Sequence, residues 1–136
     1  MFVLLGVTLS VCASANDNPD GSALFLENCG SCHGQSQSAG GRVAPPMVAV
    51  KDHYQRVHAE KAAFVSALSG WVLERSPDKS LMPGAISRFG LMPSLEISGQ
   101  DLVAIAEFVF EEPMEKPDWY AQHYQEHHGA DGEQVE

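Results

Sequence analysis

The sequence predicts an all-α domain, and three observations support this fold class. Three segments of the 136-residue chain, at about 22–32, 53–68 and 98–110, carry apolar residues near helical spacing. The stretches between them are rich in Gly, Pro and Ser, which is typical of loops. No segment alternates apolar and polar residues convincingly enough to predict a strand, and the chain has no internal repeat. We therefore expect helices joined by loops.

The first half of the chain contains two of these helices. A loop rich in Gly, Ser and Gln over 34–41 follows the first helix, and an Ala-Pro-Pro run at 44–46 stiffens the exit of that loop. Asp52 is in position to cap the second helix at its N-terminus, and Gly70 is expected to end that helix. The first two helices should therefore be separated by a long connection.

The second half contains a loop, a helix and a tail. Residues 76–93 predict a loop, because prolines and glycines recur throughout them. Ser98 is the expected N-cap of the last main helix. The apolar face of that helix consists of Leu102, Ile105, Ala106 and Val109. Two prolines, Pro113 and Pro117, separate this helix from residues 119–128. Residues 119–128 predict a short extra helix in a C-terminal tail over 113–136.

Cys29-Gly30-Ser31-Cys32-His33 is the strongest functional motif in the chain. C-x-x-C-H is the covalent attachment signature of a c-type haem. Each thiol can form a thioether to a haem vinyl group, and the following histidine places an imidazole under the iron. A redox disulfide would be expected in a βαβ context, and a zinc site needs four ligands, which would have to include distant histidines. The motif therefore predicts one covalent haem c on Cys29 and Cys32, with His33 as an iron ligand.

The loop at 76–93 contains two candidates for the other axial ligand, Met82-Pro83 and Met92-Pro93. A thioether ligand raises the reduction potential and closes the iron to exogenous ligands. A methionine often only fills space in a core. Both of these methionines, however, lie in polar loop sequence rather than on an apolar helix face, so both are candidates on the residues alone.

With these features the chain resembles the small class I c-type cytochromes of the bacterial soluble kind. Gly21, Phe25 and Cys29 are spaced four residues apart, as in that family, where the glycine and the aromatic residue meet the C-terminal helix. Ile105 and Phe108 match the family's aliphatic and aromatic contacts on that helix. The resemblance implies the cytochrome c fold, with three or more helices wrapped around one covalently bound haem.

The resemblance also implies roles for residues around the iron. A family proline at the offset of Pro45 from His33 lends its carbonyl to the second ring nitrogen of the axial histidine. The family's axial methionine lies in a Met-Pro pair shortly before the last helix, which selects Met92 over Met82. A family tryptophan at the position of Trp71 hydrogen-bonds a haem propionate. The alternative for Trp71 is an ordinary core residue whose N–H has a partner within the protein.

The duplicated Met-Pro segment and the C-terminal tail depart from the family. The tail contains His123 and His127 at i, i+4 spacing, which can hold a metal on a helix. No carboxylate motif accompanies this pair, so we expect a solvated helix whose aromatic residues pack on the domain. His53 and His58 are expected to be surface residues rather than ligands.

The N-terminal segment predicts export. Residues 1–15 form an apolar run that ends in Ala13-Ser14-Ala15, an A-x-A cleavage pattern typical of a secretory signal peptide, although no Lys or Arg precedes the run. The residues around Cys12 also resemble a lipoprotein signal, so a lipid anchor at Cys12 is the alternative. We expect a periplasmic protein with a cytochrome c domain over 16–112 and an acidic tail over 113–136.

The charge and the resemblance together predict an electron carrier. The net charge of −10 argues against nucleic acid and favours redox partners with basic docking surfaces. The resemblance, which covers roughly residues 21–109, implies Fe(II)/Fe(III) cycling between periplasmic or membrane redox partners, with no catalysis and no small-molecule substrate at the iron. Two alternatives remain: a dedicated electron-transfer subunit that docks through the tail, and a haem enzyme or gas sensor with an open sixth position.

Overall fold

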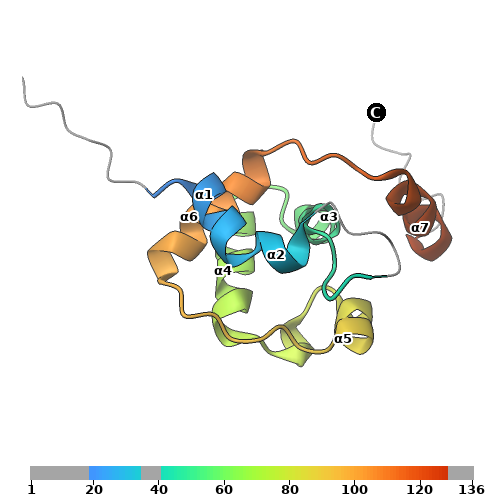
Figure 1. The fold of residues 1–136 in the computed structure, drawn as a ribbon, viewed down its shortest axis with the longest axis horizontal. Coiled ribbons are helices and arrows are strands. Elements are labelled where there is room, and N and C mark those ends of the chain that lie inside the picture. Colours follow the sequence, from blue (N-terminus) through green and yellow to red (C-terminus); the bar gives the residue numbers. More distant parts are fainter. Residues whose placement is uncertain (1–18, 35–40, 129–136) are drawn as a thin grey trace, which may run out of the picture.

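The computed structural model describes residues 19–34 and 41–128, which are arranged as helices joined by loops (Figure 1). Within these two ranges there are seven α-helices and one short 3-10 helix, and no strand. The predicted all-α fold class is therefore confirmed. No helix in the described ranges is both long and apolar enough to span a bilayer. The predicted signal peptide and Cys12 lie outside the described residues.

The predicted first helix consists of two short pieces, α1 (Gly21–Asn28) and α2 (Gly30–His33). The carboxylate of Asp20 caps α1 by accepting hydrogen bonds from the backbone N–H groups of the second and third residues that follow it. Cys29 separates the two pieces, and its backbone N–H still donates to the Phe25 carbonyl. This break leaves the Cys29 side chain buried and the Cys32 side chain exposed.

The predicted single helix over 53–68 is wrong, because two helices occupy this part of the chain. These are α3 (Met47–Val57) and α4 (Lys61–Glu74). The first begins directly after Pro46, where the missing N–H of proline is tolerated. Asp52 therefore lies in the middle of α3 and caps nothing. Gly70 does not end α4, which continues to Glu74 and stops where Arg75 adopts a left-handed conformation with φ 41°.

The predicted loop over 76–93 contains two short helices, η1 (Pro77–Lys79) and α5 (Pro83–Phe89). Proline at the first position of each helix fits, because the N–H groups of a first turn have no partner within the helix. Gly90 ends α5 with φ 81° and ψ 178°, a conformation that is essentially restricted to glycine. The chain then runs without helix to α6 (Gly99–Glu111).

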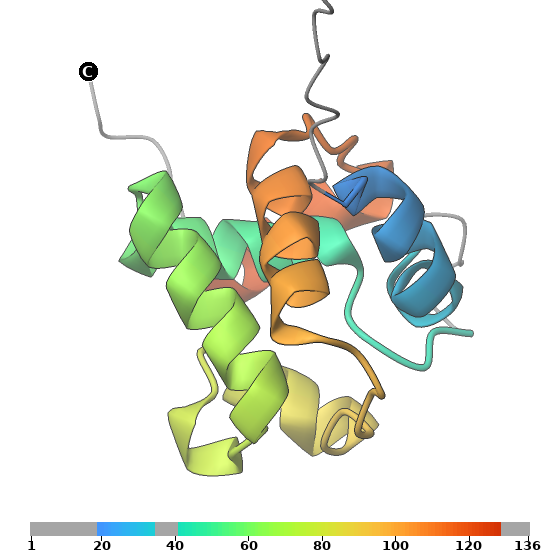
Figure 2. The same ribbon diagram turned by 90° about the vertical axis from the view of Figure 1, so that its left-hand side faces the viewer.

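Helix α6 lies between α4 and α1, as Figure 2 shows. The Ser98 hydroxyl accepts a hydrogen bond from the Asp101 N–H, so the predicted N-cap is confirmed. At the crossing of α1 and α6, a Cβ on Gly21 would lie 2.3 Å from the backbone oxygen of Ala104, so the helices approach closely only because position 21 is glycine.

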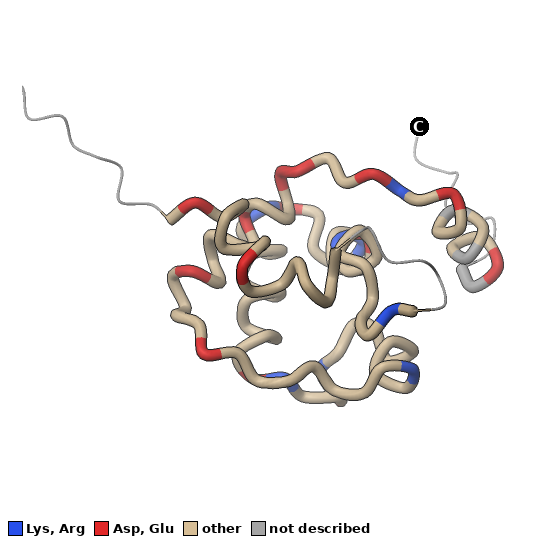
Figure 3. The backbone as a smooth tube through the Cα atoms, in the orientation of Figure 1, with Lys and Arg blue, Asp and Glu red and all other residues tan. Residues whose placement is uncertain are grey.

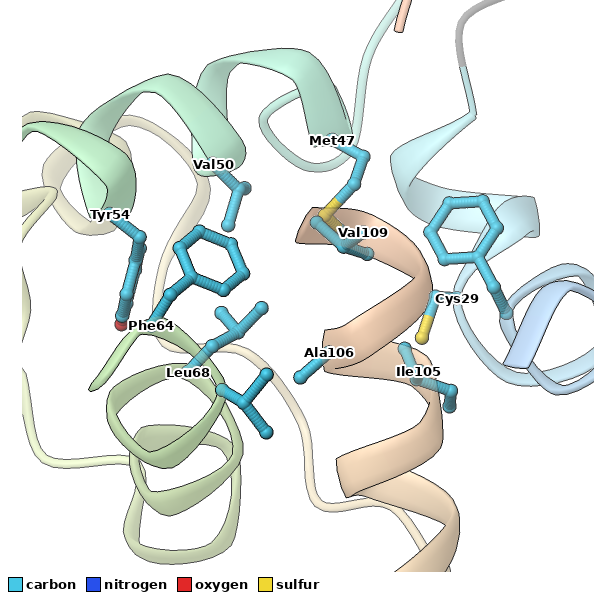
Figure 4. Packing of buried hydrophobic residues seen from close by; sticks show 11 residues of the cluster. Cys29, Met47, Val50, Tyr54, Phe64, Leu68, Ile105, Ala106 and Val109 are labelled. Atoms are coloured by element: carbon cyan, nitrogen blue, oxygen red, sulfur yellow. The ribbon is translucent and has the colours of Figure 1, made fainter. Parts of the chain in front are cut away.

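The main core forms where α1, α3, α4 and α6 converge (Figure 4). Phe25 and Phe108 pack beside the glycine crossing with ring centroids 5.5 Å apart, which confirms the predicted aromatic contact between the first and last main helices. Phe64 is fully buried and packs edge-on against Tyr54 and Phe110. This framework holds Cys29 at one edge of the core.

The predicted extra helix in the tail is α7 (Asp118–His128), and it packs beside α3 at the edge of the domain (Figure 1). Tyr120 is 3% exposed and its hydroxyl donates to the Asp52 carboxylate at 3.1 Å. Lys116 forms an ion pair with the same carboxylate at 2.9 Å. The aromatic residues of the tail thus pack on the domain as expected, while the side chains of His123 and His127 lie outside the described part.

Candidate haem site

A largely apolar cavity of about 310 Å³ opens between α2, α3, α4, α5 and α6. Seven residues that sequence reasoning singled out line this one cavity. They are Cys29, Cys32, His33, Pro45, Trp71, Met82 and Met92. Residues up to 63 positions apart in the chain therefore meet at a single site, and its walls are mostly aliphatic and aromatic side chains.

The two cysteines are free thiols with different surroundings. Burial, and secondly the neighbouring Cys32, raise the pKa of the Cys29 thiol to about 11. No cluster of three or more His, Cys, Asp or Glu side chains suited to a metal ion occurs in the described ranges. No four-ligand zinc site is therefore formed within those ranges.

His33 is held in one orientation by the backbone of the next loop. Its Nδ1 lies 2.7 Å from the Pro45 carbonyl oxygen, the contact that the family resemblance implies. Because a carbonyl only accepts, Nδ1 carries the proton and Nε2 keeps the lone pair that can bind a metal. Burial lowers the pKa of His33 and the bond to Pro45 partly opposes this, so the ring favours the neutral form that ligates iron.

The two methionines both line the cavity but differ in their other contacts. Met82 sits at the N-cap position of α5 and packs against both hydrophobic clusters of the described chain, including the one that contains Tyr120. Met92 lies in the non-helical segment after Gly90 and belongs to neither cluster. The thioether of Met82 therefore has a packing role, whereas Met92 contributes only to the cavity wall.

Trp71 also faces the cavity, but its indole N–H donates to the Ser76 carbonyl at 3.1 Å. This is the alternative that the sequence left open, a tryptophan whose N–H has a partner within the protein. A bond from Trp71 to a propionate would require this N–H to leave Ser76.

Sequence reasoning missed the contribution of α5 to the site. Ile86 and Phe89, on α5, form part of the cavity wall together with Met82. Their spacing, four residues and then three, is the periodicity of one helix face. That signal was hidden by the prolines and glycines around it, which favoured a loop.

The donor set and the cavity fit a covalently held haem. The cysteine side chains of the motif, an imidazole with Nε2 available and the thioethers of Met82 and Met92 all border one apolar space. Among metal-binding groups only a haem with two thioether links uses this combination with C-x-x-C-H spacing. The helical fold and this site define the class of c-type haem proteins.

The comparison with known families agrees with this class. The sequence model of the Cytochrome c family matches residues 19–111, so the chain belongs to the cytochrome c family. It is a haem-binding electron-transfer protein with covalently attached haem c. No curated protein and no solved structure matches the chain significantly.

Proposed function

We propose that this protein is a monohaem electron carrier. Its haem is bound through thioethers to Cys29 and Cys32, and its iron is ligated by His33 and Met92. The single observation that carries the proposal is the cavity that brings these four side chains together. One haem is proposed because the sequence contains one C-x-x-C-H motif.

The bound haem would supply an Fe(II)/Fe(III) couple, and the chain would keep that couple in a fixed environment. The Pro45 carbonyl orients His33, and the apolar walls would exclude water from a bound iron. Met92 would fill the remaining axial position, so the iron would bind no substrate. For this reason the proposed role is electron transfer rather than catalysis.

The charge of the surface supports partners with basic docking surfaces. Figure 3 shows acidic residues around α6 and along the segment that joins α6 to α7, and the whole chain has 18 acidic and 8 basic residues. Complementary charge accelerates encounters between redox proteins, and salt weakens this effect. We propose that association with partners slows as ionic strength rises.

The packing of α7 favours a free carrier over a subunit that docks through its tail. Trp119, Tyr120 and Tyr124 are the residues of α7 best suited to bind another protein, and all three are partly or fully buried against the domain. A partner would have to displace these contacts to use that face.

We further propose export to the periplasm, with cleavage after Ala15. A diacylglycerol adduct on Cys12 in the intact mass would instead establish a lipid anchor.

The ligation state of the iron tests the proposal against a haem enzyme or gas sensor. The oxidised holoprotein should show the weak long-wavelength charge-transfer band of a sulfur–iron bond, and the reduced holoprotein should not bind added carbon monoxide. Absence of the band together with rapid carbon monoxide binding would show an open site and refute the carrier role.

A further inference from the structure

A second cavity lies beside the haem site, between α5, the segment that enters α3, and α7. Its volume is about 480 Å³, which is in the range of small-molecule sites. Pro45 and Met82 contribute to the walls of both cavities. Neither the haem-attaching cysteines nor His33 or Met92 line the second one, so the two spaces are adjacent but chemically different.

Two arginines, Arg42 and Arg88, line this cavity. Burial, and secondly the positive charge of Arg88, lower the pKa of the Arg42 guanidinium, so the two groups are close enough to repel one another. None of the described lining residues is acidic. A bound anion would reduce the repulsion between these two like charges.

Within residues 19–34 and 41–128, two N–H donors of Arg42 have no hydrogen-bond partner. Its guanidinium carbon lies 3.7 Å from the ring centroid of Trp119, so a cation–π contact uses the face of the group. The N–H donors point outward in the plane of the guanidinium. Both Nε and Nη1 are buried and without a partner among the described residues, which is unusual for charged donors. These two atoms point to a missing acceptor.

The remaining walls of the cavity are apolar and aromatic. Phe89 and Pro46 form part of one side, and Trp119, Tyr120 and Tyr124 of α7 form part of another. Guanidinium groups recognise carboxylates through paired N–H donors. We propose that this cavity binds a small organic carboxylate with an aromatic or other flat apolar body, held by Arg42 and Arg88 beneath α7.

A carboxylate in this position would act on the haem through the shared wall. Its negative charge, located behind Pro45 and Met82, would favour Fe(III) over Fe(II) and lower the midpoint potential. This consequence rests on the proposed electron-carrier function, whereas binding of the carboxylate itself does not.

Calorimetric titration of the holoprotein with benzoate tests the site. We expect saturable binding, and an affinity at least about tenfold lower in Arg42→Gln and in Arg88→Gln, because each variant removes a charge-assisted hydrogen bond. Benzamide has the same flat ring without the charge and should also bind at least about tenfold more weakly. Arg88→Gln keeps the test valid if Arg42→Gln does not fold.

Arg56→Gln is the matched control. Arg56 also lies over an aromatic ring of α7, 5.2 Å from the Tyr124 centroid, but it does not line the cavity. Its replacement should leave the benzoate affinity unchanged. No saturable benzoate binding, equal binding of benzamide, or an equal loss in Arg56→Gln overturns the proposal.

A haem propionate is the other source of a carboxylate near this wall. If benzoate fails to bind and Arg42→Gln moves the pH-dependent step of the midpoint potential to higher pH, the arginines serve a propionate and the separate site is refuted. An open sixth position at the iron would contradict the carrier function. The benzoate titration would still test the carboxylate site, because that site does not depend on the iron.

Discussion

The two sides of the haem cavity are built differently. On the histidine side, α1, α2 and α6 are packed around a glycine crossing, and Pro45 holds the ligand through a bond of 2.7 Å. On the methionine side, Met92 lies in a non-helical segment between Gly90 and Ser98, outside both hydrophobic clusters. The ligand on the histidine side is already oriented by the chain. The ligand on the methionine side lies in a loop that a bound iron can position.

The largest difference between the two sides should appear in haem retention. We expect His33→Ala to yield little holoprotein, because the group that the chain orients toward the iron is lost. Met92→Ala should still mature, since the covalent links and His33 remain. The measurement is the yield of covalent haem that survives acid–acetone extraction. His58→Ala, at a half-buried residue outside the cavity, serves as the control and should retain its haem. Equal yields from His33→Ala and His58→Ala would contradict this difference.

The methionine side is tested by comparing Met92→Ala with Met82→Ala. Loss of the Met92 thioether should abolish the sulfur–iron band, lower the midpoint potential and open the iron to carbon monoxide. Met82→Ala should keep the band but reduce stability by roughly 2–5 kcal/mol, because Met82 packs against both clusters. If Met82→Ala removes the band and Met92→Ala retains it, the ligand is Met82.

The rigidity of the histidine side depends on the close approach of α1 and α6. Gly21→Ala places a methyl group where the backbone oxygen of Ala104 is only 2.3 Å away, so the helices must separate. We expect a loss of roughly 1–3 kcal/mol in the free energy of unfolding, measured by denaturant titration of the holoprotein. Gly70→Ala is the control, because no atom lies within 4 Å of its added methyl group. It should be neutral or stabilising, since alanine is the better helix former. A Gly21→Ala variant as stable as Gly70→Ala would show that the crossing can relax.

The direction of the non-helical segment that contains Met92 depends on the turn at Gly90. Its φ of 81° strains any residue with a Cβ, so Gly90→Ala should reduce stability by roughly 1–3 kcal/mol and weaken the sulfur–iron band. Gly84→Ala, within α5 and with open space around the added methyl group, should leave both unchanged or slightly raise stability. Thermal unfolding measures the stability, and the absorption spectrum of the oxidised protein measures the sulfur–iron band. An intact band in Gly90→Ala would mean that the segment reaches the iron without this turn.

The smallest effect is expected where the methionine segment joins α6. Ser98→Ala removes the cap on the Asp101 N–H and should reduce stability by about 1 kcal/mol. Ser66→Ala, at an exposed position within α4, should cause no loss. The midpoint potential should stay the same in both variants. A shift in Ser98→Ala alone would show that the cap also positions Met92.

Local signals in the sequence predicted the histidine side well. The C-x-x-C-H motif and the offset of Pro45 act over short stretches of chain. The glycine and aromatic residue of α1 also form a local spacing signal, although their contact partners lie on α6. The Ser98 cap is likewise a local signal. The assignment of Met92 as the ligand remains a prediction.

Long-range contacts explain what the sequence did not reveal. Asp52 looked like a helix cap, but its carboxylate accepts from Tyr120, 68 residues away, and pairs with Lys116. No local pattern contains that information. The cavity at Arg42 was also missed, because its walls come from a loop, α5 and α7 and meet only in the folded chain.

The burial of Cys29 has a consequence for how the protein matures. In the folded chain this thiol is 7% exposed and burial raises its pKa to about 11, which disfavours the thiolate form. Cys32, in contrast, is exposed. We therefore expect haem attachment to Cys29 to precede closure of the helix crossing around Gly21.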